Sequence, residues 1–471
     1  MRDQRDATAT AEAIRSGELD ERAVVESAVD RIEKLDPQLN AVIHTRFEEA
    51  LAEVDAGLPD GPLRGVPVLV KDLGMDVAGL PASGGSRLFA DQVPARDSEL
   101  VRRYRRAGMV VLGTTNTPEF GFNASTEPTS YGPTRNPWNA SRSPGGSSGG
   151  SAAAVIAGMV PVAHASDGGG SIRIPAAACG LFGLKPSRGR VSPAPRPTTL
   201  AGLLSHHHAL TTTVRDSALL LDIAGGPRPG DAYAAPTASA SFTELARRDP
   251  DRLRIGLVTS LPDGPDVHPD MAAAVREAAR VCEGLGHEVV ETEAVHRAAE
   301  VAAVSSVLMG VDLVTQIDQR LERLGRPLAD DDVEPLTRIV YEMNRSLTGA
   351  DVNRALRGAQ EIGWQVGAAF TRYDVLLSPV LARPTPRLGL LDTRRPETMY
   401  EHGPAYSAFT SVYNVTGMPA MSVPFGFDSD GLPAGVQFAA DLGGEAILLA
   451  LATQLERTAP WPVRAGTGDL G

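Results

Sequence analysis

The sequence predicts a mixed α/β fold in which a sheet is covered by helices on both faces. Short apolar runs that suit buried strands alternate along the chain with longer segments whose apolar residues recur at helical spacing. Hydrophobic residues make up 42% and charged residues 22% of the 471 residues, which is typical of a globular protein with an ample core. No internal repeat is visible in the sequence.

The N-terminal region begins with two predicted helices within residues 7–35. Gly17 can end the first helix, and Asp20 can cap the second. We expect a strand at 40–44 and a helix at 47–55 to follow.

The next apolar run, residues 63–70, ends at Lys71. This pattern predicts a buried strand that brings a lysine to the edge of the sheet. A lysine after a strand usually lies in solvent at the end of the strand. Where it is desolvated, however, its pKa falls toward that of a neutral amine, which can act as a base. A helix at 97–107 and a strand at 109–112 are predicted next.

Two glycine- and serine-rich stretches dominate the centre of the chain, residues 145–151 (GGSSGGS) and 167–175 (DGGGSIRIP). Such runs are usually flexible linkers. Here a helix-forming segment at 152–157 and a strand-like segment at 160–163 lie between them. Linkers do not alternate with buried elements on so short a scale. We therefore expect two tight turns that bring serine side chains and bare N–H groups close to a ligand.

The second half of the chain resumes the alternation after a Gly-, Pro- and Ala-rich connection at 225–241. Its long helical stretches carry the fewest motifs and are the expected source of a variable substrate pocket. The predicted elements are strands at 255–258, 288–291 and 373–379, helices at 269–285, 297–325, 333–347 and 350–371, and C-terminal strands within 414–424 and 431–437.

Composition argues against several functional classes. The net charge of −13 disfavours nucleic acid or an anionic membrane as a partner. Cys179 and Cys282 are too few for a disulfide framework and suit a reducing compartment. No charged-then-apolar leader is visible at residues 1–6, and no apolar run approaches the length of a membrane span. We expect a cytoplasmic protein that needs no cofactor.

A metal site is not expected either. No His/Cys cluster has zinc spacing. The three consecutive histidines at 206–208 would point to alternate faces of an extended segment, and no set of carboxylate ligands accompanies them.

The two central stretches resemble the paired motif of the amidase signature family, a GGSS(G/S)G run followed by D-x-G-G-S-(I/V)-R-x-P. The spacing between Ser147 and Ser171 also fits. Further matches surround Lys71 (GVPVLVKD) and occupy 114–121 (TTNTPEFG) and 179–190 (CGLFGLKPSRGR). The resemblance covers about 60–225 strongly and 370–455 moderately.

The resemblance implies one amidase domain over 1–471, built on a large mixed, mostly parallel sheet with helices on both faces. Its expected parts are N-terminal helices (1–60), the signature core (61–225), a connection (226–250) and a variable helical part with the C-terminal strands (251–471).

The resemblance also implies the catalytic roles. Ser171 would attack the amide, Ser147 would relay the proton after a cis peptide bond from Gly146, and Lys71 would be the base. The successive glycines before the nucleophile offer backbone N–H groups for an oxyanion hole. The expected oxyanion residues are Gly168, Gly169 and Gly170, and the expected supporting residues are Ser148, Asp167 and Arg173. Gly168 stands where the family often carries Thr or Ile.

Two alternative functions are open at this point. The first stretch also satisfies G-x-S-x-G, the nucleophile elbow of α/β-hydrolases, in which Ser147 would attack and His402 could complete a triad. That elbow needs a strand directly before it, and residues 139–144 look loop-like. The other alternative is the amidase subunit of a tRNA-dependent amidotransferase, although Ile174 stands where that subunit typically carries Gln.

Within the family, the form of the second stretch looks most like the branch of bacterial 6-aminohexanoate-cyclic-dimer hydrolases and general amidases. This likeness suggests a small to medium, largely apolar, linear or cyclic amide as substrate, and a monomer or homodimer as the working form. The expected pocket walls lie in 121–131, 190–210, 300–320 and 400–415, with Phe122, Met309, Tyr406 and Phe409 as candidate lining residues.

Overall fold

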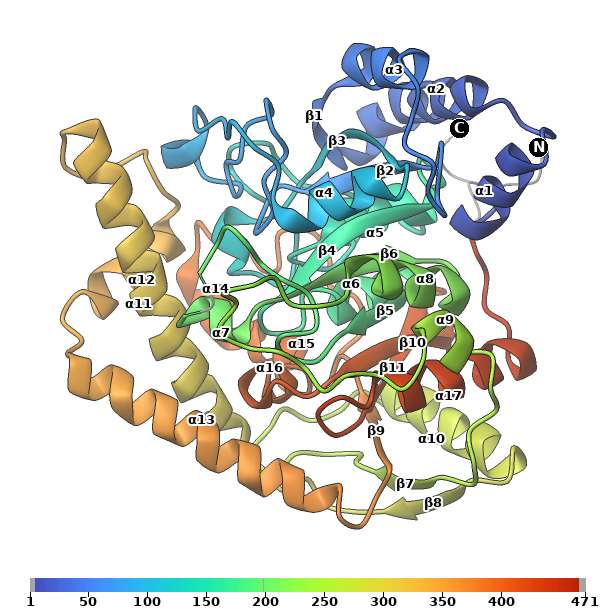
Figure 1. The fold of residues 1–471 in the computed structure, drawn as a ribbon. Coiled ribbons are helices and arrows are strands. Elements are labelled where there is room, and N and C mark those ends of the chain that lie inside the picture. The colour runs from blue at the N-terminus through green and yellow to red at the C-terminus, as the bar shows by residue number, and fades with distance from the viewer. Residues whose placement is uncertain (1–4, 198, 466–471) are drawn as a thin grey trace.

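The computed structural model describes residues 5–197 and 199–465, and its centre is one eleven-stranded sheet (Figure 1). Two predictions fall partly outside the described residues. The absence of a leader was predicted from a stretch that includes residues 1–4, and the predicted pocket wall at 190–210 includes position 198. In sheet order the strands are β1 (Val42–Thr45), β3 (Val110–Thr115), β2 (Pro67–Lys71), β4 (Val162–Asp167), β6 (His206–Thr211), β5 (Phe182–Lys185), β10 (Ala420–Phe427), β11 (Pro433–Ala439), β9 (Val375–Pro379), β7 (Arg254–Leu257) and β8 (Glu288–Glu291).

The sheet is mixed, as predicted, but it is not mostly parallel, because six of the ten pairings between the described strands are antiparallel. β2 pairs in parallel with β3 and β4, and β7 pairs in parallel with β8 and β9. The strands between these two groups pair antiparallel, and β1 joins β3 antiparallel at one edge. Strands from both halves of the chain share this sheet, so we infer a single domain.

Helices cover both faces of the sheet (Figure 1). Their bounds are α1 (Ala7–Arg15), α2 (Glu21–Leu39), α3 (Phe47–Asp55), α4 (Glu99–Arg106), α5 (Gly149–Ile156), α6 (Arg173–Cys179), α7 (Ala201–Leu204), α8 (Val214–Ala224), α9 (Phe242–Leu245), α10 (Pro269–Gly284), α11 (Ala298–Leu324), α12 (Pro335–Asn344), α13 (Gly349–Ala369), α14 (Pro396–His402), α15 (Pro404–Ser407), α16 (Val412–Thr416) and α17 (Glu445–Thr458). Asp20 caps α2 by accepting the Ala23 N–H, as predicted.

Strand β2 shows how the two faces are filled. Val68 and Val70 belong to the core that contains α4, α8, α10 and α17, whereas Leu69 belongs to the core that contains α2, α3 and α5. Successive side chains of a strand point to opposite faces. Lys71 therefore lies on the same face as Leu69, toward α5.

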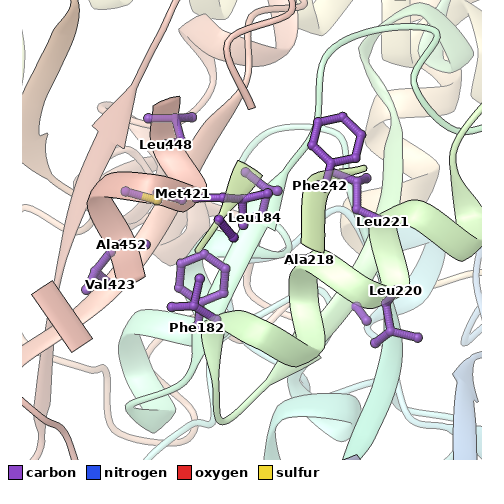
Figure 2. Packing of buried hydrophobic residues seen from close by; sticks show 14 of the residues in the cluster. Phe182, Leu184, Ala218, Leu220, Leu221, Phe242, Met421, Val423, Leu448 and Ala452 are labelled. Carbon is purple, nitrogen blue, oxygen red and sulfur yellow. The ribbon is translucent and has the colours of Figure 1, made fainter. Parts of the chain in front are cut away.

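The larger core lies between β5, β10 and the helices α8 and α17 (Figure 2). Phe182 and Leu184 of β5 alternate with small or polar neighbours, and Met421 and Val423 of β10 do the same. This period of two buries one side of each strand against the helices. The helices contribute further residues to this cluster, among them Ala218, Leu220, Leu221, Phe242, Leu448 and Ala452.

Helices α11, α12 and α13 form a long helical layer beside the sheet (Figure 1). An 18-residue window of α11 has a mean hydropathy of 1.6, so its length and composition meet the requirement for a membrane span. The sequence-based prediction concerned an uninterrupted apolar run, and polar residues such as Ser305, Ser306 and Asp312 interrupt this helix. In the structure, one side of α11 packs against α7, α12, α13 and α16.

Some predicted boundaries are wrong. The strand predicted at 160–163 is β4, which continues to Asp167. The polar residues at its end, Ser166 and Asp167, are buried like the apolar residues before them. The strand predicted within 414–424 is β10, which begins at Ala420, because the first residues of that segment end the short helix α16.

Candidate active site

Lys71 ends β2 and is fully buried. Its Nζ lies 2.6 Å from Ser147 Oγ and 3.0 Å from Ser166 Oγ. Burial lowers the Lys71 pKa to about 7, and the negative charge of Asp167 opposes this shift only in part. A substantial share of the Lys71 side chain is therefore the neutral amine near pH 7, and that form can accept a proton from a serine hydroxyl.

Ser147 lies in the tight turn before α5, and the Gly146–Ser147 peptide bond is cis, as the family resemblance implied. The turn is closely packed. A Cβ added at Gly146 would lie 2.6 Å from the Asn123 carbonyl oxygen, and one added at Gly121 would lie 3.1 Å from Ser147 Oγ. Neighbouring backbone thus fixes the position of the Ser147 hydroxyl.

Ser148 ties this turn to β4. Its Oγ donates to the Ser166 carbonyl oxygen at 3.2 Å and lies 3.3 Å from the Ser166 N–H. Ser166 is therefore held in contact with both Ser148 and Lys71.

Ser171 follows the glycines of what we call the nucleophile loop, residues 167–171, and precedes Ile172, the N-cap residue of α6. Its side chain is 9% exposed. Across residues 5–197 and 199–465, no partner is found for the Ser171 hydroxyl, and Ser147 Oγ does not contact it within hydrogen-bond distance. Of the three candidate catalytic residues, Ser171 is thus the most exposed, whereas Ser147 and Lys71 are almost completely buried.

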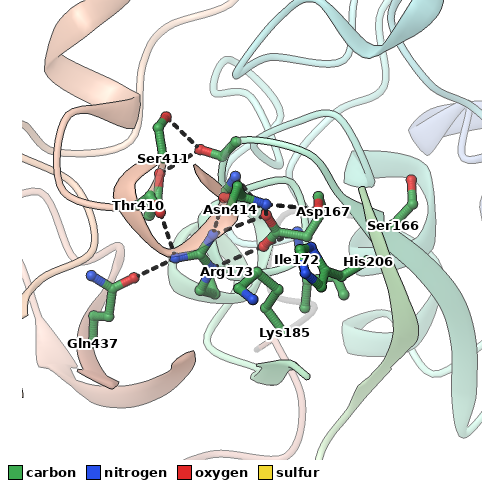
Figure 3. A network of polar contacts seen from close by, with 12 residues as sticks. Ser166, Asp167, Ile172, Arg173, Lys185, His206, Thr410, Ser411, Asn414 and Gln437 are labelled. Carbon is green, nitrogen blue, oxygen red and sulfur yellow. Dashed lines mark hydrogen bonds and ion pairs between the residues drawn. The ribbon is translucent and has the colours of Figure 1, made fainter. Parts of the chain in front are cut away.

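A buried ion pair anchors the nucleophile loop (Figure 3). Arg173 donates from Nε and Nη2 to the two carboxylate oxygens of Asp167, both at 2.9 Å, and both side chains are fully buried. Arg173 also donates to the Thr410 carbonyl oxygen and to the side chains of Asn414 and Gln437. Burial alone would raise the Asp167 pKa, but the Arg173 guanidinium outweighs it and holds that pKa well below its usual range.

The oxyanion prediction needs one correction. The Gly170 N–H donates to Asp167 Oδ1 at 2.7 Å, and the Ile172 N–H donates to Oδ2 at 3.1 Å. Gly170 is therefore not a free donor. Within the nucleophile loop, all of which the structure describes, the N–H groups of Gly168, Gly169 and Ser171 have no acceptor.

The histidines of β6 make separate contacts. His206 Nδ1 contacts the Leu204 carbonyl oxygen, His207 stacks on His164, and His208 Nε2 contacts Ser217. The Lys71 N–H donates to His164 Nδ1 at 3.3 Å. Burial lowers the pKa of His207 to about 3 and that of His208 to about 4. Within the described residues, no group of three or more His, Cys, Asp or Glu side chains could hold a metal ion.

The four candidate pocket residues differ in their surroundings. Met309 of α11 faces the nucleophile loop, since its Cε lies 3.8 Å from the position a Cβ would take at Gly168. Phe122 is partly buried in an apolar cluster with Leu313 and Ile317 of the same helix. Tyr406 and Phe409 are buried in two other apolar clusters, which gives them core surroundings.

Two cavities lie elsewhere. One of about 500 Å³ is lined by Trp138, Phe427 and Trp461, and another lies beside Phe409 and Tyr413. Neither is lined by Lys71 or the two serines.

Sequence reasoning missed several residues of this site. His164 and Ser166 belong to β4, but they follow the apolar segment 160–163 that the sequence predicts as a strand. Thr410, Asn414 and Gln437 contact Arg173, which anchors the nucleophile loop, from more than 230 positions away. For these distant residues the available signals were the moderate family likeness of the C-terminal segment and the pocket wall predicted at 400–415, which contains Thr410 and Asn414.

Residues 23–449 match the family described as Amidase. The chain is 40% identical to the 6-aminohexanoate-cyclic-dimer hydrolase of Paenarthrobacter ureafaciens, over 98% of this chain and 96% of that protein. The solved structure of a 6-aminohexanoate cyclic dimer hydrolase complexed with substrate superposes with a TM-score of 0.93 at 38% identity, covering 98% of this chain and 99% of that one. A bacterial aryl acylamidase of the amidase signature family superposes with a TM-score of 0.87 at 29% identity, covering 97% of both chains.

Proposed function

We propose that this chain, which belongs to the amidase family and hydrolyses amide C–N bonds, forms an acyl-enzyme on Ser171 with Ser147 and Lys71 as its proton relay. The observation that carries the proposal is the 2.6 Å contact between Lys71 Nζ and Ser147 Oγ, made by a lysine whose burial lowers its pKa to about 7. A neutral amine beside a hydroxyl is the arrangement that activates a serine without a histidine.

The proton moves in two transfers. Neutral Lys71 takes the Ser147 proton while Ser147 takes the Ser171 proton, and Ser171 Oγ bonds to the amide carbon. The tetrahedral intermediate collapses by breaking the C–N bond, and the relay returns the proton to the leaving amine. Water then attacks the ester on Ser171, which yields the carboxylic acid and restores the serine.

The negative oxygen of the intermediate needs backbone donors. The unpartnered N–H groups of Gly168, Gly169 and Ser171 are the donors we propose, in place of Gly170. A single oxyanion donor typically contributes about 3–4 kcal/mol to lowering the barrier.

The substrate we propose is a small to medium, largely apolar amide, linear or cyclic. Three observations support it. The relatives include proteins named 6-aminohexanoate-cyclic-dimer hydrolase, and the loop at Gly168 faces the apolar side chain of Met309. The chain also lacks a phosphate-binding G-x-x-x-x-G-K-[ST] motif.

The purified protein can be tested on glutamine, aliphatic amides, aryl anilides and cyclic amides, compared by kcat/KM. The proposal expects cyclic or ω-amino amides to be preferred over glutamine without any partner subunit. A clear preference for glutamine, or turnover only with added subunits, would contradict it.

The alternative with Ser147 as nucleophile is not favoured. No strand directly precedes Ser147 among the described elements, and its hydroxyl contacts a lysine rather than a histidine. We further propose a cytoplasmic location, supported by two buried free cysteines, and a monomer or homodimer as the working form.

A further inference from the structure

We propose that Thr410 and Ser411 are positioning residues for the oxyanion site, because their hydroxyls hold the Gly169 peptide of the nucleophile loop. This inference rests on the proposed function. Thr410 Oγ1 donates to the Gly169 carbonyl oxygen at 2.6 Å, and Ser411 Oγ lies 3.0 Å from the same oxygen (Figure 3). Both residues come from the segment between α15 and α16, far along the chain from the loop.

The peptide unit between Gly169 and Gly170 is held from both sides. Its carbonyl oxygen accepts from the two hydroxyls, and its N–H donates to Asp167 Oδ1. The neighbouring peptide units carry the free N–H groups of Gly169 and Ser171. Fixing the central unit therefore restricts the direction of the donors on either side, which is the preorganisation that an oxyanion site requires.

Close packing reinforces this restraint. Gly170 has φ +134°, a region that side chains rarely adopt, and a Cβ there would lie 2.4 Å from Thr410 Oγ1. Thr410 is fully buried and lies directly over Gly170. The hydroxyl that holds the peptide is thus itself held in place.

The two hydroxyls are not equivalent. Each has one proton, and each also lies near the Ser407 carbonyl oxygen, at 3.1 Å for Thr410 and 3.0 Å for Ser411. Thr410 is clearly closer to Gly169, whereas Ser411 is equally close to both acceptors. Thr410 is therefore the main donor to the loop, and Ser411 is the secondary one.

The test compares Thr410→Val, which keeps the shape and removes the hydroxyl, with Thr410→Ser, which keeps the hydroxyl. Thr416→Val is the matched control, because Thr416 is a buried threonine at the end of the adjoining helix α16 and its hydroxyl contacts the Met418 N–H. We expect kcat of Thr410→Val to fall about 10- to 100-fold with KM nearly unchanged, as a small misplacement of catalytic groups can cause. The kcat of Thr410→Ser and of Thr416→Val should stay near the wild-type value. The kcat of Ser411→Ala should fall less than that of Thr410→Val.

A second readout separates positioning from folding. A trifluoromethyl ketone that adds to Ser171 forms an oxyanion. Its affinity for Thr410→Val should therefore fall together with kcat. The affinity of a non-reacting amide analogue for the same variant should not change. The inference would be overturned if folded Thr410→Val kept the wild-type kcat and the wild-type affinity for the ketone. It would also be overturned if Thr416→Val lost as much kcat and ketone affinity as Thr410→Val. If the wild-type protein cleaved no amide at all, the proposed function itself would fail.

Discussion

Lys71 and Asp167 are the last residues of β2 and β4, two neighbouring parallel strands of the sheet. The strand ends therefore deliver the proposed base and the anchor of the nucleophile loop to the same edge. The ionised carboxylate raises the Lys71 pKa against the larger effect of burial, which keeps that pKa near neutrality.

The pH dependence of turnover should report the protonation of Lys71. Because only the neutral amine accepts a proton, kcat/KM should rise with pH up to about 7 and then level off. Lys71→Ala should lower kcat by about 10²–10⁴-fold or more and remove this dependence. Steady-state kinetics from pH 5 to 9 check the prediction. The same rise of kcat/KM with pH in Lys71→Ala as in the wild type would contradict it.

Removing the charge of Asp167 should destabilise the fold. Asp167→Asn leaves Arg173 as a buried cation without its ion-pair partner, which typically costs about 3–5 kcal/mol of unfolding free energy. Urea unfolding measures the change. The matched control is Glu244→Gln, which breaks an exposed ion pair with Arg248 and should cost at most about 1 kcal/mol. Equal effects of the two substitutions would refute the structural role of the buried pair.

Gly168 should control the size of the acyl pocket. A Cβ there would meet only Met309 within 4 Å, at ordinary contact distance, so Gly168→Thr is compatible with the fold and fills space beside the loop. We expect this variant to keep activity on a small aliphatic amide and to lose at least about 10-fold in kcat/KM on a bulky cyclic one, within the range that a pocket's steric contacts provide. Equal losses on both substrates would show that the space is not part of the pocket.

Glu119 should make the stability fall between pH 5 and pH 8. Burial, together with the nearby Glu334, raises the Glu119 pKa from its ordinary value of 4.5 to about 7. The folded state thus keeps a proton that the unfolded state has released, and this contribution to stability is lost as pH rises through about 7. Glu119→Gln should flatten the decline in unfolding free energy over that range, whereas Glu342→Gln, at an exposed position of α12, should not. A wild-type slope in Glu119→Gln would contradict the assignment.

The motifs predicted the chemical groups better than their surroundings. The motifs that resemble the amidase signature singled out Lys71 and Ser147, and these two residues lie in contact. Local patterns predicted the strand end and the tight turn that carry them, because both are encoded by nearby residues. The choice of oxyanion donors was not predictable, since it depends on which N–H groups Asp167 occupies. The contacts of Thr410 with the loop join residues 241 positions apart, and no local periodicity encodes them.

The most direct test of the central claim is to locate the covalent adduct. The protein is treated with a serine-reactive fluorophosphonate, digested, and mapped by mass spectrometry, with Ser171→Ala and Ser147→Ala treated in parallel. We expect the label on Ser171 in the wild type, no label in Ser171→Ala, and slower labelling of Ser171 in Ser147→Ala because the relay is broken. A label on Ser147 in the wild type, or undiminished labelling of Ser171→Ala, would contradict the account.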